Sequence, residues 1–350
     1  MARIGVNALY LIPGGVGGTE IYLRNLLSAL ARIDRENQYI VFTNRETGQD
    51  LVPQQVNFLW APQPVHATIR PWRLFWEQTG LPLAVKRHRV DVLLNAGFTC
   101  PVICPSRTVT VFHDLQHKRY PQYFRWFDLP FWNLFLWAAT KSSDKLIAVS
   151  GATRNDLRHF YGTDAEVVHH GAEVPFFEMA AERQPKDYIL CVSTLHPHKN
   201  LERLLRAHAN SSSLPDLVIT GLKGFASREI EQLAGGRVRI TGWIPRQELY
   251  QLFRGARAFV YPSTFEGFGI PVLEAMAAGI PIACSDIPPL REVAGPTVLY
   301  FDPTDENDIR RAMEQVMTDN SLVDAARDRA AQFTWEKAAR ETLRVILSQT

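Results

Sequence analysis

Two glutamates, Glu266 and Glu274, bracket a glycine-containing segment whose residue types suit a polar ligand. A strand-like run at 258–261 precedes the first glutamate, and a short helix with Pro271 in its first turn is predicted around the second. Ligands of open α/β sheets bind at the carboxyl ends of strands, and the glycines leave backbone amides open near the positive end of the helix dipole. Two carboxylates and bare amides fit a ligand with hydroxyls and phosphate, such as a nucleotide sugar. A strand–turn–helix junction with two solvated acids fits the spacing equally well.

A lysine in the second half of the chain also has a position that suits binding. Lys199 follows the strand-like run at 188–193 and lies close to the amino end of a helix predicted to reach residue 209. A cation at that end opposes the helix dipole, so the position is unfavourable for helix stability. The ammonium group makes better sense facing an anion.

Two polar signals in the first half follow predicted strands. A glycine-rich turn at 13–18 separates the strand at 3–7 from a helix predicted over 19–31, and such a turn can cradle a phosphate. It matches neither the G-x-G-x-x-G nor the P-loop pattern, so an ordinary tight turn is the commoner explanation. His113 follows the β-branched run at 108–112, and that place favours a ligand role over a capping or core-edge role.

The composition excludes several function classes. The 350 residues suffice for two domains, and 38 basic against 36 acidic side chains give a net charge of +2, which argues against a polyanion-binding protein. The four cysteines are scattered, so free thiols in a reducing compartment are favoured over a metal site. No targeting segment and no run of about 20 apolar residues is visible. We therefore expect a cytoplasmic protein that at most touches the inner face of a membrane.

Strands and helices alternate along both halves of the chain, which predicts an α/β protein with two doubly wound parallel sheets. A polar stretch at 178–187 follows the last strand of the first half, predicted at 166–170, and we place the domain boundary there. The expected domains are residues 1–170 and residues 171–335, with a closing helix at 336–350.

The segment from Tyr120 to Trp137 holds nine aromatic side chains. It could enter a membrane interface or grip a lipid-linked substrate. The polar face expected of an interfacial helix is missing between residues 129 and 139. A core helix with a packed loop is therefore the favoured interpretation.

The motifs described above resemble a known enzyme family. Residues 266–279 look like the E-x7-E signature of retaining glycosyltransferases of family GT4, which have the GT-B fold. Further resemblances follow in order along the chain: Gly17-Gly18, 111–115, 149–150, 170–173, 195–201 and 241–245. The likeness implies two Rossmann-like domains facing across a cleft: an acceptor-side domain, on which the closing helix packs back, and a donor-binding domain. Segments 74–78 and 113–124 resemble bacterial polysaccharide mannosyltransferases, which implies GDP-mannose as the donor and a UDP-hexose as second choice.

The resemblance also implies roles for individual residues. Lys199 would neutralise the donor diphosphate, Glu266 would hold donor-sugar hydroxyls, and His113 would contact the transferring sugar. Glu274 would accept hydrogen bonds from the ribose. The other implied donor-binding positions are the amides of Gly17 and Gly18, the backbone of Phe268, Gly269 and Ile270, the base-lining Trp243 and Ile244, and His198.

One departure from the family pattern concerns the leaving group. The family usually has an arginine beside or just before the lysine, whereas this chain has His196 and His198. An imidazole is charged only in part near neutrality. We expect weaker stabilisation of the departing diphosphate, or help from another cation such as Arg203 or Arg228.

The implied activity is the transfer of a hexose, with retention, from a nucleotide-diphosphate sugar to a glycan, lipid-linked or natural-product acceptor. No metal or other cofactor is expected, because the lysine, glycine amides and helix amino ends supply positive charge and no Asp-x-Asp element follows a predicted strand. No nucleic-acid partner is expected. Two alternatives remain open. One is a GT-B-fold nucleotide-sugar epimerase, and the other is a non-catalytic nucleotide-sugar-binding scaffold, which the missing arginine would suit.

Overall fold

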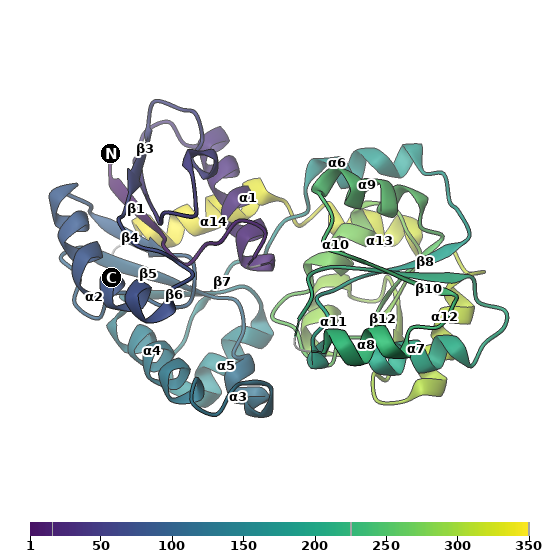
Figure 1. Ribbon diagram of the computed structural model, residues 1–350. Helices are drawn as coiled ribbons and strands as arrows, with labels where there is room; N and C mark the ends of the chain where they lie inside the picture. Colours follow the sequence, from purple (N-terminus) through teal and green to yellow (C-terminus); the bar gives the residue numbers. More distant parts are fainter. Residues whose placement is uncertain (16, 225, 349–350) are drawn as a thin grey trace. The chain divides into compact units, whose positions relative to one another are not determined.

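The computed structural model describes residues 1–15, 17–224 and 226–348, and the chain divides into two compact units (Figure 1). Unit 1 comprises Met1–His170 and Trp335–Thr350, and unit 2 comprises Gly171–Thr334. Each unit contains one sheet whose strands all pair in parallel, which confirms the predicted α/β class with two parallel sheets.

The sheet of unit 1 has seven strands in the order β3-β2-β1-β4-β5-β6-β7. Their bounds are β1 (Arg3–Ala8), β2 (Gln38–Thr43), β3 (Phe58–Pro62), β4 (Val92–Asn95), β5 (Arg107–Phe112), β6 (Lys145–Ala148) and β7 (Glu166–Val167). The central strands are almost continuously buried, as expected of a parallel sheet covered on both faces. The order changes direction between β1 and β4, so the loops after these two strands part at the carboxyl edge, where open sheets bind ligands.

The helices of unit 1 cover this sheet. They are α1 (Gly18–Ile33), α2 (Arg70–Arg87), α3 (Gln116–Arg119), α4 (Leu129–Ser142), α5 (Gly151–Tyr161) and α14 (Trp335–Leu347), with single turns of 3-10 helix at Gln49–Leu51 and Pro121–Tyr123. Figure 1 shows the carboxyl-terminal α14 lying beside the amino-terminal α1. Arg32 on α1 pairs with Glu336 on α14 at 2.6 Å. Arg107 donates to the carbonyls of Ile346 and Ser348, at 2.8 and 2.7 Å, and so satisfies acceptors at the end of that helix.

The sheet of unit 2 has six strands in the order β10-β9-β8-β11-β12-β13. Its strands are β8 (Tyr188–Val192), β9 (Asp216–Thr220), β10 (Val238–Gly242), β11 (Ala258–Tyr261), β12 (Ile282–Ser285) and β13 (Leu299–Phe301). Its helices are α6 (Val174–Met179), α7 (Leu201–Ala209), α8 (Ser227–Leu233), α9 (Arg246–Gly255), α10 (Ile270–Ala277), α11 (Pro288–Ala294), α12 (Glu306–Val316) and α13 (Val323–Ala330), with 3-10 turns at Ala180–Glu182 and Pro197–Lys199. Apolar side chains of α7 and α12 pack with those of β8, β9 and β11 in one core cluster.

One local prediction differs from the structure. The strand predicted at 166–170 ends at Val167, because His170 leaves the ladder and packs its ring 5.0 Å from Tyr22 and 5.7 Å from Trp335. Within unit 2, the polar stretch at 178–187 carries the end of α6 and a 3-10 turn.

The interpretation of the aromatic segment as a core helix holds for one face of α4 only, where Leu136 and Ala139 belong to a core cluster. Only Leu136, Ala139 and Thr140 of α4 are buried. The exposed fractions of the large apolar side chains here are 82% for Trp126, 57% for Phe131, 57% for Leu134 and 51% for Trp137. A helix that is apolar all round is usually buried, so sequence alone could not show that one face of α4 lies outside the core. None of the helices in the described part of the chain is long and apolar enough to span a membrane.

Candidate functional site

Lys199 and Glu266 form a close ion pair at the carboxyl edge of the sheet of unit 2. The Lys199 ammonium lies 2.6 Å from Oε1 of Glu266 and donates to the Tyr261 hydroxyl at 3.2 Å. Both charged side chains are largely shielded, with 14% and 11% of their surfaces exposed. The pair brings a cation and an acceptor-rich carboxylate, predicted from separate motifs, to one point.

The backbone around Lys199 is fixed by a residue in the left-handed region. Asn200 has φ +56° between the 3-10 turn and α7, a conformation that asparagine tolerates better than most residues. Its side-chain amide nitrogen donates to the carbonyls of Pro262 and Pro303 at 3.1 and 2.7 Å. The Thr264 amide donates to the His198 carbonyl at 2.8 Å. The lysine turn and the loop after β11 are therefore held together as one surface.

The two histidines before Lys199 contact each other. Nδ1 of His196 and Nδ1 of His198 lie 2.6 Å apart, so one ring donates and the other accepts. Burial, together with the positive charge of Lys199, lowers the pKa of His198 to about 2 and also lowers the pKa of His196. The two imidazoles are therefore neutral near pH 7. They stabilise a departing diphosphate less than an arginine would, and less than the partly charged imidazoles expected from the sequence. Arg203 donates to Oδ1 of Asn200 at 2.9 Å, one residue from Lys199.

Glu274 is buried on α10 and faces an arginine that the sequence analysis missed. Its exposed fraction is 2%, and Oε1 lies 2.5 Å from the guanidinium of Arg246, which also contacts Glu173 at 2.6 Å. Burial raises the pKa of Glu274, and Arg246 opposes that shift. Burial also disfavours the charged guanidinium, but the two carboxylates outweigh it and raise the pKa of Arg246. The arginine follows the 241–245 motif directly, and this was the one available signal.

The segment between the two glutamates requires glycine at one position. Gly269 has φ +106° as the residue before α10, and a Cβ there would lie 2.4 Å from Cδ2 of Leu290. Phe268 is buried, with its ring 6.1 Å from that of Phe333, and Ile270 begins the helix. The backbone at 268–270 is thus held close to the helix amino end.

Trp243 and Ile244 follow β10 in unit 2, on the loop that leads to Arg246. Trp243 is exposed, at 58%, and Ile244 is partly buried. An exposed indole three residues before Arg246 gives a surface on which a flat ring could stack.

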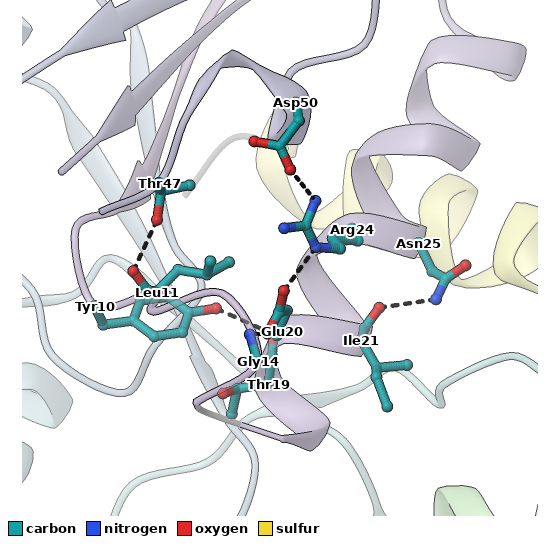
Figure 2. Close-up of polar contacts among 10 residues, drawn as sticks. All are labelled: Tyr10, Leu11, Gly14, Thr19, Glu20, Ile21, Arg24, Asn25, Thr47 and Asp50. Carbon is teal, nitrogen blue, oxygen red and sulfur yellow. Dashed lines mark hydrogen bonds and ion pairs between the residues drawn. The ribbon is translucent and has the colours of Figure 1, made fainter. Parts of the chain in front are cut away.

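The glycine-rich turn of unit 1 is braced by side chains of α1 (Figure 2). Gly17 has φ +60° and precedes the helix, which Gly18 begins, while the predicted turn residue Val16 lies outside the described residues. Glu20 accepts from the Gly14 amide and from Nε of Arg24, both at 2.8 Å. This bracing stabilises the turn, and a Cβ at Gly17 would meet no described atom within 4 Å.

His113 lies at the carboxyl end of β5 in a ring cluster. Its Nε2 is 2.9 Å from the Ala96 carbonyl, and its ring lies 4.8 Å from Tyr22 of α1 and 5.7 Å from His170. Because a carbonyl only accepts, Nε2 must carry the proton and Nδ1 is left as an acceptor. Burial lowers the pKa of His113 to about 4, so the ring is neutral at pH 7.

The structure brings the predicted residues together in two groups. Lys199, His198 and Glu266 adjoin one another in unit 2, which also holds Glu274, Trp243 and the 268–270 backbone. Gly17, Gly18 and His113 belong to unit 1, where Tyr22 connects α1 with the histidine. Within the described chain, no group of three or more histidine, cysteine or acidic side chains is arranged to hold a metal ion.

Two family models match nearly the whole chain. Residues 16–174 match the model for Glycosyltransferase Family 4, and residues 176–333 match the model for Glycosyl transferases group 1. Among similar proteins is O-antigen chain mannosyltransferase B of Escherichia coli, 29% identical over 264 residues, which cover 68% of this chain and 69% of the relative. Another is the O-antigen chain mannosyltransferase RfbU of Salmonella typhimurium, 27% identical over 258 residues, with 71% of each chain covered.

Solved structures share the fold over the full length. HepE of Anabaena, in complex with UDP and glucose, has a TM-score of 0.77 at 17% identity, with 100% of both chains covered. WaaG, a glycosyltransferase of lipopolysaccharide biosynthesis, has a TM-score of 0.74 at 17% identity over 100% of both chains. Sucrose-phosphate synthase of Thermosynechococcus elongatus has a TM-score of 0.79 at 20% identity over 98% of both chains.

Proposed function

Because the chain belongs to the GT4 glycosyltransferases and has the GT-B fold, we propose that it transfers a hexose from a nucleotide-diphosphate sugar to a glycan or lipid-linked acceptor. The transfer proceeds with retention of anomeric configuration and without a metal. The enzyme acts in the cytoplasm.

The ion pair of Lys199 and Glu266 is the observation that supports this proposal best. A lysine at the amino end of α7, 2.6 Å from a shielded carboxylate, offers a cation for phosphate and an acceptor for hydroxyls in adjacent positions. A donor that brings its own anion and hydroxyls replaces the contacts that the two side chains now make with each other.

The chemistry depends on charge that develops as the anomeric bond breaks. The nucleoside diphosphate leaves with added negative charge, while the sugar becomes oxocarbenium-like. Lys199 stabilises the departing diphosphate, and a positioned cation in a shielded site does this without reorganising solvent. Glu266 holds the sugar hydroxyls, and neutral His113 uses its Nδ1 as a hydrogen-bond acceptor. Gly17 and Gly18 offer amides to the diphosphate.

Nucleotide recognition falls to the residues around Glu274. Its carboxylate accepts hydrogen bonds from the ribose hydroxyls and keeps its contact with Arg246. Trp243 and Ile244 line the base, and Phe268, Gly269 and Ile270 contribute backbone contacts. GDP-mannose is the favoured donor, because the two O-antigen chain relatives described above are named mannosyltransferases. A UDP-hexose is the second choice, because HepE was solved with UDP and glucose.

The test combines nucleotide-sugar binding with substitution of the ion pair. Calorimetry with GDP-mannose, UDP-glucose and UDP-galactose identifies the donor, and transfer is then measured for Lys199→Ala and Glu266→Gln. We expect transfer to fall by roughly 10²–10³-fold in each variant, the usual effect of removing one charge-stabilising group. Lys186→Ala removes an exposed lysine just before β8 and serves as the matched control.

The outcomes separate the three functions considered. Unchanged transfer in Lys199→Ala would contradict the proposal. A new sugar isomer formed from the donor alone would indicate an epimerase. Tight donor binding with neither transfer nor isomerisation would indicate a binding scaffold.

A peripheral membrane contact belongs to the same proposal. The outward face of α4 presents Phe131, Leu134 and Trp137, and exposed basic residues Arg125 and Lys141 flank it. Aromatic side chains between basic residues suit the interface of an anionic bilayer. Such a contact would bring unit 1 close to a lipid-linked acceptor.

A further inference from the structure

Arg73 on α2 is a buried arginine whose only oppositely charged neighbour of note is Glu77, one turn further along the helix. Only 8% of its surface is exposed, and its Nε is buried without a hydrogen bond to any described residue. Its neighbour Arg70 is fully engaged: it lies 3.5 Å from Asp128 and stacks 4.3 Å from the centre of the Trp132 ring. Buried charges are normally paired, so Arg73 is an exception that needs an explanation.

The position of Arg73 is the carboxyl edge of the sheet of unit 1. One helical turn further along α2, Glu77 accepts from the Thr99 hydroxyl at 3.0 Å and is 3.5 Å from the amide of Asn7, near the end of β1. Arg73 precedes Glu77 by that turn. Val85, in the carboxyl-terminal part of α2, packs in one cluster with Val90, which lies just before the start of β4. The carboxyl end of α2 therefore lies near the amino ends of the strands, and its amino end, with Arg73, lies toward their carboxyl ends.

The neighbourhood of Arg73 contains further buried polar groups. Oε1 of Glu77 is buried without a partner, although Glu77 has only 1% of its surface exposed. The Tyr10 ring covers the loop after β4 so closely that a Cβ on Gly97 would lie 2.2 Å from it. The side-chain amide of Asn7 also donates a hydrogen bond to Oδ1 of Asn95 at 3.0 Å. A guanidinium nitrogen and a carboxylate oxygen, each without a hydrogen bond, therefore occur one helical turn apart at the carboxyl edge of the sheet, where open sheets bind ligands.

We propose that Arg73 binds an oxyanion, phosphate or carboxylate, on the acceptor, beside sugar hydroxyls that reach Glu77. The planar guanidinium matches the two oxygens of either group. Burial raises the pKa of Glu77, so a proton on this carboxylate can relieve repulsion from the bound anion. This inference rests on the proposed transferase function and gives its acceptor a chemical class: a saccharide that carries negative charge.

The experiment removes the charge but keeps the volume. Binding of inorganic phosphate and of acetate to the full chain is measured by calorimetry in Lys199→Ala, which weakens the anion site of unit 2, and in Lys199→Ala with Arg73→Met. Arg87→Met, at the exposed end of the same helix, is the matched control. We expect at least a tenfold loss of affinity for one probe with Arg73→Met and none with Arg87→Met. The probe affected tells phosphate from carboxylate.

Thermal melting separates binding from a structural role. Burial lowers the pKa of Arg73 more than the attraction of Glu77 raises it, so the buried charge does not stabilise the fold. Arg73→Met should therefore melt at the same or a higher temperature without a ligand. A lower melting temperature with unchanged probe binding would overturn the inference. So would a tenfold loss of nucleotide-sugar affinity in Arg73→Met alone, because Arg73 would then serve the donor. If the wild type binds no nucleotide sugar but Arg73 still binds phosphate, the proposed function fails and the anion site stands.

Discussion

His113 shows how burial fixes the state of one residue. The hydrogen bond to Ala96 assigns the proton to Nε2, and the ring cluster with Tyr22 and His170 keeps the imidazole neutral. A neutral ring with a defined acceptor can receive a sugar hydroxyl. A charged ring would repel an oxocarbenium-like sugar.

This burial predicts a pH dependence of stability. The pKa of His113 is lowered to about 4, while that of an unfolded histidine is about 6.5. Between these values the unfolded chain binds more protons, so the free energy of unfolding falls as the pH drops. Going from pH 7 to 5 should cost about 2 kcal/mol for this one residue.

Urea titrations at pH 7 and pH 5 measure this loss. Seven of the eight tryptophans belong to unit 1, so their fluorescence follows the unit that contains His113. His113→Asn keeps an N–H donor for Ala96 without a titrating ring and should lose less stability over that range. An equal loss in the variant and the wild type would contradict the assignment.

Single residues were predictable where a local rule applied. Lys199 is unfavourable for its own helix, and that conflict identified it before any contact was known. Arg246 escaped notice, because its pairing with Glu274 and Glu173 joins distant parts of the chain. Arg73 escaped for the opposite reason, since only a folded structure shows that a charged side chain is buried with a nitrogen that makes no hydrogen bond.

Among the elements, α10 depends on a single glycine. Gly269→Ala places an L-residue at φ +106° and a Cβ 2.4 Å from Leu290, so it should lower the free energy of unfolding by about 1–3 kcal/mol. Hydrogen exchange should rise first in 266–277. Gly235→Ala, where a Cβ meets no described atom within 4 Å, is the control. Equal effects of the two substitutions would refute this role.

The exposed face of α4 gives a second prediction at this scale. Phe131→Ser with Trp137→Ser should reduce sedimentation with phosphatidylglycerol vesicles at least fivefold, because each aromatic side chain contributes about 1.5–3 kcal/mol on burial. Leu83→Ser alters an exposed apolar residue on α2 and should have no effect. Vesicle binding unchanged by the double substitution would exclude this helix as the contact.

The elements differ in how far sequence determines them. Strands such as β5 are short runs rich in β-branched residues, and this composition and length predicted them from the sequence. The exposure of α4 depends on what packs beside it, which an apolar pattern cannot specify.

For the whole molecule, alternation of strands and helices predicted two parallel sheets, but not the strand order. The neighbours of β1 are β2 and β4, and the second pairing joins Ile4 to Val92, which is far away in the sequence. Such partners are chosen by packing over long separations. Local propensity carries no information about them.

The path of the chain predicts which unit folds alone. Unit 2 is one continuous segment, whereas unit 1 is completed only by α14. Residues 171–334 expressed alone should therefore melt cooperatively in circular dichroism, while residues 1–170 alone should not. Cooperative melting of residues 1–170 without α14 would contradict this.

The two junctions of unit 2 also adjoin. Ala172 bridges Thr334, its amide donates to the Phe333 carbonyl at 3.0 Å, and the rings of His170 and Trp335 lie 5.7 Å apart in unit 1. Because the first and last residues of unit 2 are adjacent, this unit can be removed or exchanged without changing the path of the chain in unit 1. Chimaeras spliced at these two points offer a direct route to new donor preferences on an unchanged acceptor module.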